Sequence, residues 1–492
     1  MQYKWVALSV TAVGTLMSGV DIRIIIVGLP TVARQLGADA EAVIWVSQAY
    51  LLASTVGLLL IGRVSDIFGR VKMYNLGFAV FTIGSALASI SQSPLQLILS
   101  RIVQGTGSSM LVGNSAAILT DAAPPNELGT MLGTNQIAFR VGSVMGLTLS
   151  GVIISMASWR ALFYINIPIG IFGTLWAHYR LKEVSTLDVE KKIDWLGFFT
   201  FTSGLIFVLV SITFLSYGFG STLPGVRMLV AGLLLIVYFV RRETKSPYPL
   251  LDLHLMKIRE FALGNIAQFL NALAWFGVVV MLSFYLQVVL NYNPLQAGIA
   301  LLPLEVTYVL FGPISGKLSD KYGQRLFSTM GLIVTSLGFF VLSQVRYTSS
   351  YSEIAVSLLL LGAGNGMFVS PNISSIMGSV PPNRRGIASA FRTTLFNVGG
   401  TLSTGLIVLL ITSGIPYSVF STLLQSLTPV SLGTTVQHEF VNGFRFACLV
   451  LAIVNTAAIL PSFLRGPRKK YSIDEKTLDN GTPRGRTDAS LE

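Results

Sequence analysis

Long apolar segments separated by short polar connections recur along this 492-residue chain. An α-helix rises 1.5 Å per residue, so about 20 consecutive apolar residues cross the ~30 Å hydrocarbon layer of a bilayer. Fourteen segments have roughly that length, which predicts an all-α polytopic membrane protein with 14 transmembrane helices. The predicted spans are 5–29, 42–61, 74–92, 95–119, 131–157, 161–179, 193–216, 224–240, 261–290, 295–315, 326–345, 353–378, 386–413 and 442–464.

The composition excludes a water-soluble domain. Hydrophobic residues make up 52% of the chain, charged residues make up 11%, and the mean hydropathy is +0.68, whereas soluble domains average about 25% charged residues. The first apolar segment is too long for a cleaved signal peptide and contains Asp21 and Arg23, so we expect it to be retained. Cys448 is the only cysteine, which excludes an intramolecular disulfide and disfavours a redox or metal role.

The net charge of +12 is concentrated on one side of the predicted spans rather than in a patch for nucleic acid. With 14 spans, 25 of the 34 Lys and Arg residues fall in alternate loops and the two termini, and four fall in the opposite loops. The positive-inside rule therefore places both termini in the cytoplasm of a multi-pass protein, which we expect in the cell membrane. The polar segment 466–492 is expected to be a disordered cytoplasmic tail.

Two parts of the chain repeat each other at a nearly constant offset. The segment GRVSDIFG at 62–69 matches GKLSDKYG at 316–323, an offset of 254 residues, and 105–112 matches 362–369 at an offset of 257. Two structural repeats around a central cavity are a common transporter architecture. The expected organisation is an N-terminal six-helix half at 1–181, two inserted helices with cytoplasmic connections at 182–258, and a C-terminal six-helix half at 259–465.

The motifs carry a resemblance to a known family. The segment GRVSDIFGRVK at 62–72 resembles the loop motif of the major facilitator superfamily, and RIVQG at 101–105 resembles its fourth-span motif. The stretches 21–30 and 159–170 are similar to the 14-span drug:proton antiporter branch of that superfamily. The resemblance covers about residues 1–465 and implies a secondary transporter that alternates between inward-open and outward-open states.

Asp21 lies inside the first span, where a charge costs at least ~2.5 kcal/mol unless it is paired, hydrated or protonated. It lies roughly 12 Å below the outer end of that span, and Arg101 lies at a similar depth in the fourth span. Opposite charges at one depth in neighbouring helices offset each other's burial, so we expect an ion pair. The resemblance implies that this arginine helps a proton move through Asp21, and a static structural pair is the alternative.

The loop after the second span is the candidate cytoplasmic gate. Asp66 follows a tight turn expected at Gly62 and has basic neighbours, so its carboxylate can pair with arginine and hold one half of the protein against the other. The repeat at Asp320 and the resemblance favour this role over that of an ordinary solvated loop. The predicted gate residues are Gly62, Arg63, Asp66, Gly69, Arg70 and Asp320.

Further polar groups inside spans are candidates for an auxiliary proton site and for substrate contacts. Glu305 follows Pro303 near the middle of the tenth span and is predicted to be a second proton or cation site, with helix packing as the alternative. Arg140 or Arg392 is expected to contact an anionic or zwitterionic substrate, and pairing between helices is the alternative. The other candidates for the substrate cavity are Asn135, Gln136, Asn271 and Trp275.

These patterns predict a proton-coupled secondary transporter that exports small amphiphilic organic compounds, of the multidrug type, by alternating access. The segment 146–151 lacks the proline and one glycine of the antiporter motif in this family, and the embedded arginines also leave open a carrier of organic anions or metabolites. A non-transporting sensor or channel is a remoter alternative. The sequence contains no nucleophile–base pair, metal-ligand set or phosphate-binding loop, so we expect no enzymatic activity and no cofactor. The expected partners are a small-molecule substrate, protons and the lipid bilayer, and no nucleic acid.

Overall fold

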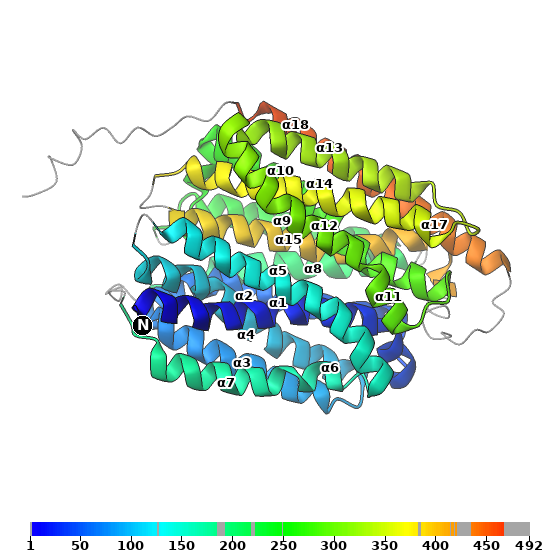
Figure 1. Ribbon diagram of the computed structural model, residues 1–492, viewed down its shortest axis with the longest axis horizontal. Helices are drawn as coiled ribbons and strands as arrows, with labels where there is room; N and C mark the ends of the chain where they lie inside the picture. Colours follow the sequence, from blue (N-terminus) through cyan, green and yellow to red (C-terminus); the bar gives the residue numbers. More distant parts are fainter. Residues whose placement is uncertain are drawn as a thin grey trace, which may run out of the picture.

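The computed structural model describes residues 2–124, 127–184, 192–217, 222–247, 249–381, 385–413, 415–417, 419–420 and 434–466. Within these ranges every regular element is a helix, and most helices run roughly along the longest axis of the molecule (Figure 1). The prediction of an all-α fold is therefore confirmed. The expected tail at 466–492 lies outside the described residues except for Gly466.

The first half consists of seven helical segments that form six spans. The sixth span is divided into two segments at Ile165. The segments are α1 (Tyr3–Leu36), α2 (Ala40–Phe68), α3 (Arg70–Ser89), α4 (Pro94–Ala122), α5 (Leu128–Met156), α6 (Ala161–Tyr164) and α7 (Asn166–Arg180).

The second half follows a short 3₁₀ helix, η2 (Leu253–Lys257), and is built in the same way. Its second span is divided at Leu301 and its last span at Ala458. The segments are α10 (Arg259–Val288), α11 (Pro294–Ala300), α12 (Leu302–Tyr322), α13 (Gln324–Ser343), α14 (Tyr351–Gly378), α15 (Arg385–Thr412), α17 (Thr434–Ala457) and α18 (Ile459–Leu464).

Two further helices, α8 (Trp195–Ser216) and α9 (Thr222–Glu243), pack against each other between the halves in the sequence, and α8 also contacts α2 and α15. Asp194 connects this pair, because it accepts a hydrogen bond from the Gly197 backbone at 2.9 Å and forms an ion pair with Arg242 at 2.8 Å. Burial raises the pKa of Asp194, but the hydrogen bonds from Arg242 and Gly197 outweigh it and hold the pKa below its usual value.

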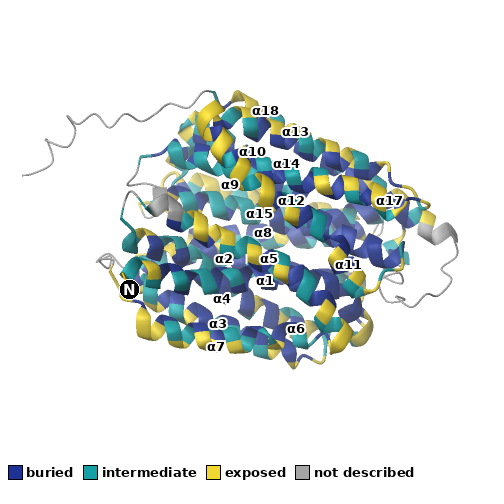
Figure 2. Ribbon diagram, in the orientation of Figure 1, coloured by how far each residue is buried: buried dark blue, intermediate teal, exposed yellow. Residues whose placement is uncertain are grey.

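Thirteen of the described spans combine the length and the apolar composition that crossing a membrane requires. The remaining long helix, α4, has 29 residues and completes the predicted count of 14, although buried polar side chains such as Arg101 and Gln104 make it less apolar. Exposed residues are spread over the outer helices (yellow in Figure 2), and many of them are large and apolar, including Ile83, Leu95 and Phe172. Such a surface suits contact with lipid.

Several helices extend beyond the predicted spans. Helix α1 continues past Pro30 to Leu36, and α2 continues to Phe68. Gly62 therefore lies inside a helix, and the tight turn expected there is formed at Gly69 instead. Gly69 has φ of +102°, a backbone conformation that favours glycine, and its repeat counterpart Gly323 has φ of +100°. The end of the apolar segment is thus not the end of the helix.

The internal repeat is visible in the packing of the helices. Helix α4 packs against α2 and α3 in the first half, and α14 packs against α12 and α13 in the second. The backbones approach closely at equivalent glycines, since a Cβ on Gly107 would overlap the backbone of Phe81 and a Cβ on Gly364 would overlap Thr335. These two contacts are related by the same offsets of 257 and 254 residues that relate the sequence motifs.

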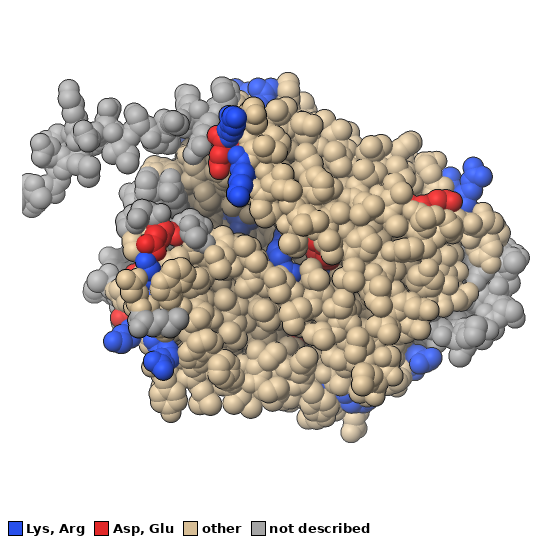
Figure 3. Space-filling model, in the orientation of Figure 1, with Lys and Arg blue, Asp and Glu red and all other residues tan. Residues whose placement is uncertain are grey.

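The two halves meet through α1 and α5 against α10–α12 and through α2 against α15. At the end of the bundle remote from the N-terminus the contacts are close, because Ser283 donates a hydrogen bond to the Ile26 carbonyl at 3.4 Å and Gly151 lies against the backbone of Leu295. Nearer the N-terminal end, a Cβ on Gly133 or Gly312 would meet open space. Figure 3 shows a hollow between the halves, with atoms of basic and acidic side chains inside it.

Replacing Gly107 with Ala is expected to destabilise the protein by about 1–3 kcal/mol, because the added methyl group meets the Phe81 backbone and pushes α3 and α4 apart. Gly133→Ala is the matched control, since its methyl group meets open space and alanine favours a helix. Thermal unfolding of both purified variants in the same detergent measures the difference. Equal unfolding midpoints would contradict the close packing of α3 and α4.

Candidate functional site

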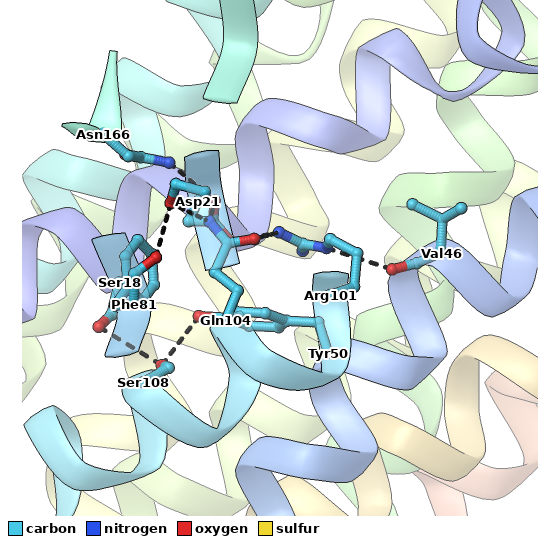
Figure 4. Close-up of polar contacts among 10 residues, drawn as sticks. Ser18, Asp21, Val46, Tyr50, Phe81, Arg101, Gln104, Ser108 and Asn166 are labelled. Carbon is cyan, nitrogen blue, oxygen red and sulfur yellow. Dashed lines mark hydrogen bonds and ion pairs between the residues drawn. The ribbon is translucent and has the colours of Figure 1, made fainter. Parts of the chain in front are cut away.

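Asp21 of α1 is completely buried and accepts hydrogen bonds from three side chains (Figure 4). Arg101 donates to Oδ2 at 2.6 Å, Gln104 donates to Oδ1 at 2.7 Å, and Asn166 donates to Oδ1 at 3.0 Å. Arg101 and Gln104 come from α4, whereas Asn166 is the first residue of α7. Three helices therefore meet at one carboxylate, and the structure brings the expected partners Asp21 and Arg101 together.

The guanidinium of Arg101 is held on its other sides as well. Its Nε donates to the Val46 carbonyl at 3.2 Å, and its Cζ lies 4.2 Å from the centre of the Tyr50 ring. A cation over an aromatic ring gains about 2 kcal/mol or more where water is excluded. Each charge of the pair thus has several partners, which a buried ion pair needs to offset its loss of hydration.

Gln104 and Asn166 are partners of Asp21 that the sequence patterns do not reveal. Gln104 follows Arg101 by three residues, so the two share a face of α4, and this spacing is a usable signal. Asn166 gives no such signal, because the division between α6 and α7 decides where it lies. In α14 the repeat positions of Arg101 and Gln104 are Leu358 and Leu361, so this polar site belongs to the first half alone.

A second buried ion pair joins the two halves. Glu305 of α12 is completely buried, and its Oε1 lies 3.3 Å from Nη2 of Arg23 in α1. Within the described ranges, the two carboxylate oxygens of Glu305 have no hydrogen-bond partner. Nη1 of Arg23 also has none there. Glu305 lies inside the 29-residue span Pro294–Tyr322, in agreement with the predicted depth. The sequence patterns do not identify Arg23 as its partner.

Arg140 and Arg392 are half-buried. Arg140 of α5 donates to the Tyr308 hydroxyl at 2.6 Å, and its Cζ lies 4.0 Å from the centre of that ring. Arg392 of α15 contacts Thr393 at 3.2 Å, and its Nε has no partner in the described part of the chain. The ring of Trp275 lies 6.2 Å from that of Tyr308. Tyr308, which the sequence patterns do not single out, therefore connects two of the predicted cavity residues.

The three amide candidates for the cavity have different surroundings. Asn135 is buried and bonds to hydroxyl groups of α1 and α4 at 3.1 and 2.9 Å, so it joins helices of the first half and is not placed between the halves. Asn271 donates to Asn455 at 3.0 Å inside the second half. Gln136 is exposed on α5. Asn135 and Asn271 are thus used in helix packing in this conformation, and their place in a substrate cavity stays a prediction.

Asp66 and Arg70 are paired at the N-terminal end of the bundle. Arg70 lies 3.1 Å from Asp66 and 2.7 Å from Asp121, which is near the end of α4. Glu183 accepts a hydrogen bond from the Arg70 backbone at 3.1 Å and so caps α3. All of these contacts are made within the first half and the segment that follows it, so in this conformation they do not hold the halves together.

The repeat does not reproduce the charged cluster in the second half. Asp320 is exposed and forms no ion pair with any described residue, because Gln324 occupies the position equivalent to Arg70 and binds Ser374 at 2.6 Å. Arg63 donates to the Lys192 carbonyl at 3.1 Å. In the part of the chain that the structure describes, no group of three or more His, Cys, Asp or Glu side chains is placed to hold a metal ion.

Two repeated six-span halves that enclose buried ion pairs define a polytopic membrane transporter. The family model of the Major Facilitator Superfamily matches residues 11–404 and 264–477. The riboflavin transporter RibZ of Clostridioides difficile (strain 630) is 32% identical over 404 residues, which cover 82% of this chain and 87% of that protein. The tetracenomycin C resistance and export protein of Streptomyces glaucescens is 26% identical over 411 residues, which cover 83% of this chain and 76% of that protein.

A solved structure has a similar fold. It is a bacterial homolog of the human lysosomal transporter Spinster in an inward-facing and unoccupied conformation, with a TM-score of 0.67, 15% identity, and coverage of 94% of this chain and 97% of that chain. The family match and the riboflavin transporter show that this chain belongs to the major facilitator superfamily. It is a multi-pass membrane transporter and not an enzyme.

Arg101→Leu introduces the residue found at the repeat position in α14 and is expected to destabilise the protein by about 3–5 kcal/mol, because it leaves Asp21 buried without its guanidinium partner. Adding Asp21→Asn removes the unpaired charge, so the double variant is expected to recover much of the lost stability. Thermal unfolding in one detergent compares the two single variants with the double variant. Stability losses that simply add would contradict a direct interaction between the two side chains.

Proposed function

We propose that the protein is a proton-coupled secondary active transporter that exports small amphiphilic organic compounds by alternating access. The observation that carries this proposal is the complete burial of Asp21 among the donors Arg101, Gln104 and Asn166. An ionisable group at this depth is costly to maintain, and in transporters such groups mark proton pathways. Asp21 is the proposed proton carrier, and Arg101 is its partner.

Protonation of Asp21 would couple charge to conformation. It replaces an ion pair by weaker neutral contacts, so α4 and α7 are held less tightly to α1, and deprotonation restores the contacts. One proton that crosses 100 mV supplies ~2.3 kcal/mol. That free energy supports roughly a forty-fold concentration gradient of substrate.

The relatives support a small organic substrate. One is named as a transporter of riboflavin, and the other is named for resistance to and export of tetracenomycin C. The proposed export direction rests on the second name and on the resemblance of the sequence motifs to drug:proton antiporters. Although the segment 146–151 lacks the proline of the antiporter motif, Gly142 and Gly146 still allow α5 to pack directly on the backbone of α1.

The proposed location is the cell membrane, with both termini in the cytoplasm. In that orientation the close contacts of Ser283 and Gly151 lie on the outer side, and the hollow in Figure 3 faces the cytoplasm. Asp66 and Arg70 then lie at the inner ends of α2 and α3 and form the proposed cytoplasmic gate. Their contacts with Asp121 are expected to rearrange when the inner side closes.

A carrier of organic anions or metabolites is the second candidate. The half-buried guanidinium groups of Arg140 and Arg392 favour it, because cations are poorly suited to a space lined by arginines. Glu305 is the proposed auxiliary acid in either case. A sensor or channel on the same scaffold is less well supported, since neither needs a buried proton carrier.

Asp21→Asn is expected to abolish accumulation driven by an imposed pH gradient in proteoliposomes, because the amide keeps the shape of the site and cannot exchange a proton. The substrate for this assay comes from a susceptibility panel in a host that lacks its own exporters. Substrate counterflow without a gradient is the control and is expected to persist in the variant. Undiminished gradient-driven accumulation would rule out Asp21 as the proton carrier.

Asp66→Asn is expected to reduce transport about two- to fivefold while expression is unchanged, because loss of a partly exposed ion pair worth up to ~1 kcal/mol alters the balance between the two open states. Asp320→Asn is the matched control from the repeat. Its carboxylate is exposed and forms no ion pair with a described residue, so a smaller effect is expected. The two variants are compared by their initial rates of counterflow, normalised to the amount of protein in the membrane. A normal rate for Asp66→Asn would refute its role in the gate.

A further inference from the structure

A group of charged side chains between the two halves bears on the charge of the substrate, an inference that rests on the proposed transport function. Arg23 of α1 pairs with Glu305 of α12 at 3.3 Å, and Arg140 of α5 donates to the Tyr308 hydroxyl of the same α12 at 2.6 Å. Arg392 of α15 interacts electrostatically with Tyr308 and Arg140, and we call Arg23, Arg140, Arg392 and Glu305 the arginine cluster. The charges of all four act on the Tyr308 hydroxyl. The cluster therefore contains three guanidinium groups and one carboxylate, and its formal charge is positive.

The arginine cluster is poorly satisfied compared with the site around Asp21. Asp21 accepts three hydrogen bonds of 2.6–3.0 Å, whereas Glu305 has one 3.3 Å contact with Arg23 and no hydrogen bond to a described residue. Nη1 of Arg23 and Nε of Arg392 also lack partners among the described residues. Buried donors without acceptors cost free energy, so the cluster favours a ligand that brings anionic oxygen atoms.

Two buried aromatic rings, those of Tyr308 and Trp275, pack next to Arg140. Arg140 lies over the ring of Tyr308 at 4.0 Å, and Trp275 lies 6.2 Å beyond that ring, centre to centre. Guanidinium groups stack on aromatic faces as well as binding oxyanions. Tyr308 and Trp275 are themselves buried, so they make the surroundings of the Arg140 guanidinium apolar, which favours an anionic group attached to an apolar, aromatic body.

We propose that the arginine cluster is the substrate-binding site and that it takes an organic anion with an aromatic body. The anionic group of the ligand binds Arg23, Arg140 and Arg392, and it competes with Glu305 for Arg23. Glu305 thus acts as an internal competitor, which neutralises Arg23 while the site is empty.

Two xanthene dyes of opposite charge test the proposed ligand class. Fluorescein is an anion and rhodamine 123 is a cation on a similar ring system, so their difference in affinity reports on charge. Fluorescence anisotropy with the full-length protein in lipid nanodiscs measures binding without any proton gradient. A failure here therefore leaves proton coupling through Asp21 intact, and a failure of the Asp21→Asn experiment leaves anion binding intact. The expected result is at least tenfold tighter binding of fluorescein.

Substitutions within the cluster give effects of opposite sign. Arg140→Gln and Arg392→Gln are each expected to weaken fluorescein binding about tenfold, whereas Arg346→Gln, which removes an exposed loop charge, is expected to leave it unchanged. Glu305→Gln is expected to tighten fluorescein binding, because it removes the competitor. Thermal unfolding shows which variants are folded. Because two arginines are substituted separately, the test still works if one of the two variants misfolds.

Three results would overturn the proposal. The first is binding of fluorescein no tighter than that of rhodamine 123. The second is an effect of Arg140→Gln and Arg392→Gln no larger than that of Arg346→Gln. The third is weaker fluorescein binding by a folded Glu305→Gln variant, which would make Glu305 a support for the ligand rather than its competitor.

Discussion

The ion pair between Asp21 and Arg101 is the interaction on which the first half of the molecule depends. Two opposite charges without water are stable only where each has further polar partners, and here Gln104, Asn166 and the Val46 carbonyl supply them. This requirement fixes the positions of α1, α2, α4 and α7 relative to one another. The same requirement makes the site sensitive to a single proton. A neutral Asp21 no longer attracts the guanidinium of Arg101, and its hydrogen bonds with the other side chains become weaker.

The scaffold is duplicated, but the chemistry is not. Gly107 and Gly364 allow the same close helix packing in the two halves, and Gly69 and Gly323 form the same turn. In contrast, α14 carries Leu358 and Leu361 where α4 carries a guanidinium and an amide. The two halves therefore share their backbone packing. They differ in their side chains, and only the first half has the residues that form the buried Asp21–Arg101 pair.

Much of the fold is predictable from the sequence because span length, composition and repeat motifs are local properties. The 14 helices and the depth shared by Asp21 and Arg101 follow from counting residues. Helix ends are harder to predict from the sequence, because a helix can continue past its apolar segment. The turn expected at Gly62 is formed at Gly69 for this reason. Contacts such as Arg23 with Glu305 depend on how each helix is rotated about its axis, which the apolar pattern of a nearly all-buried helix does not specify.

Asp21 and Arg23 are separated by one residue in α1, and successive residues on a helix are turned by about 100°, so the two side chains point to nearly opposite faces. One face meets α4 and α7, and the other meets Glu305 across the boundary between the halves. A small rolling motion of this single helical turn would alter both environments at once. Protonation of Asp21 therefore has to act across only the width of one helix to affect the space between the halves. No long relay of intermediate side chains is needed.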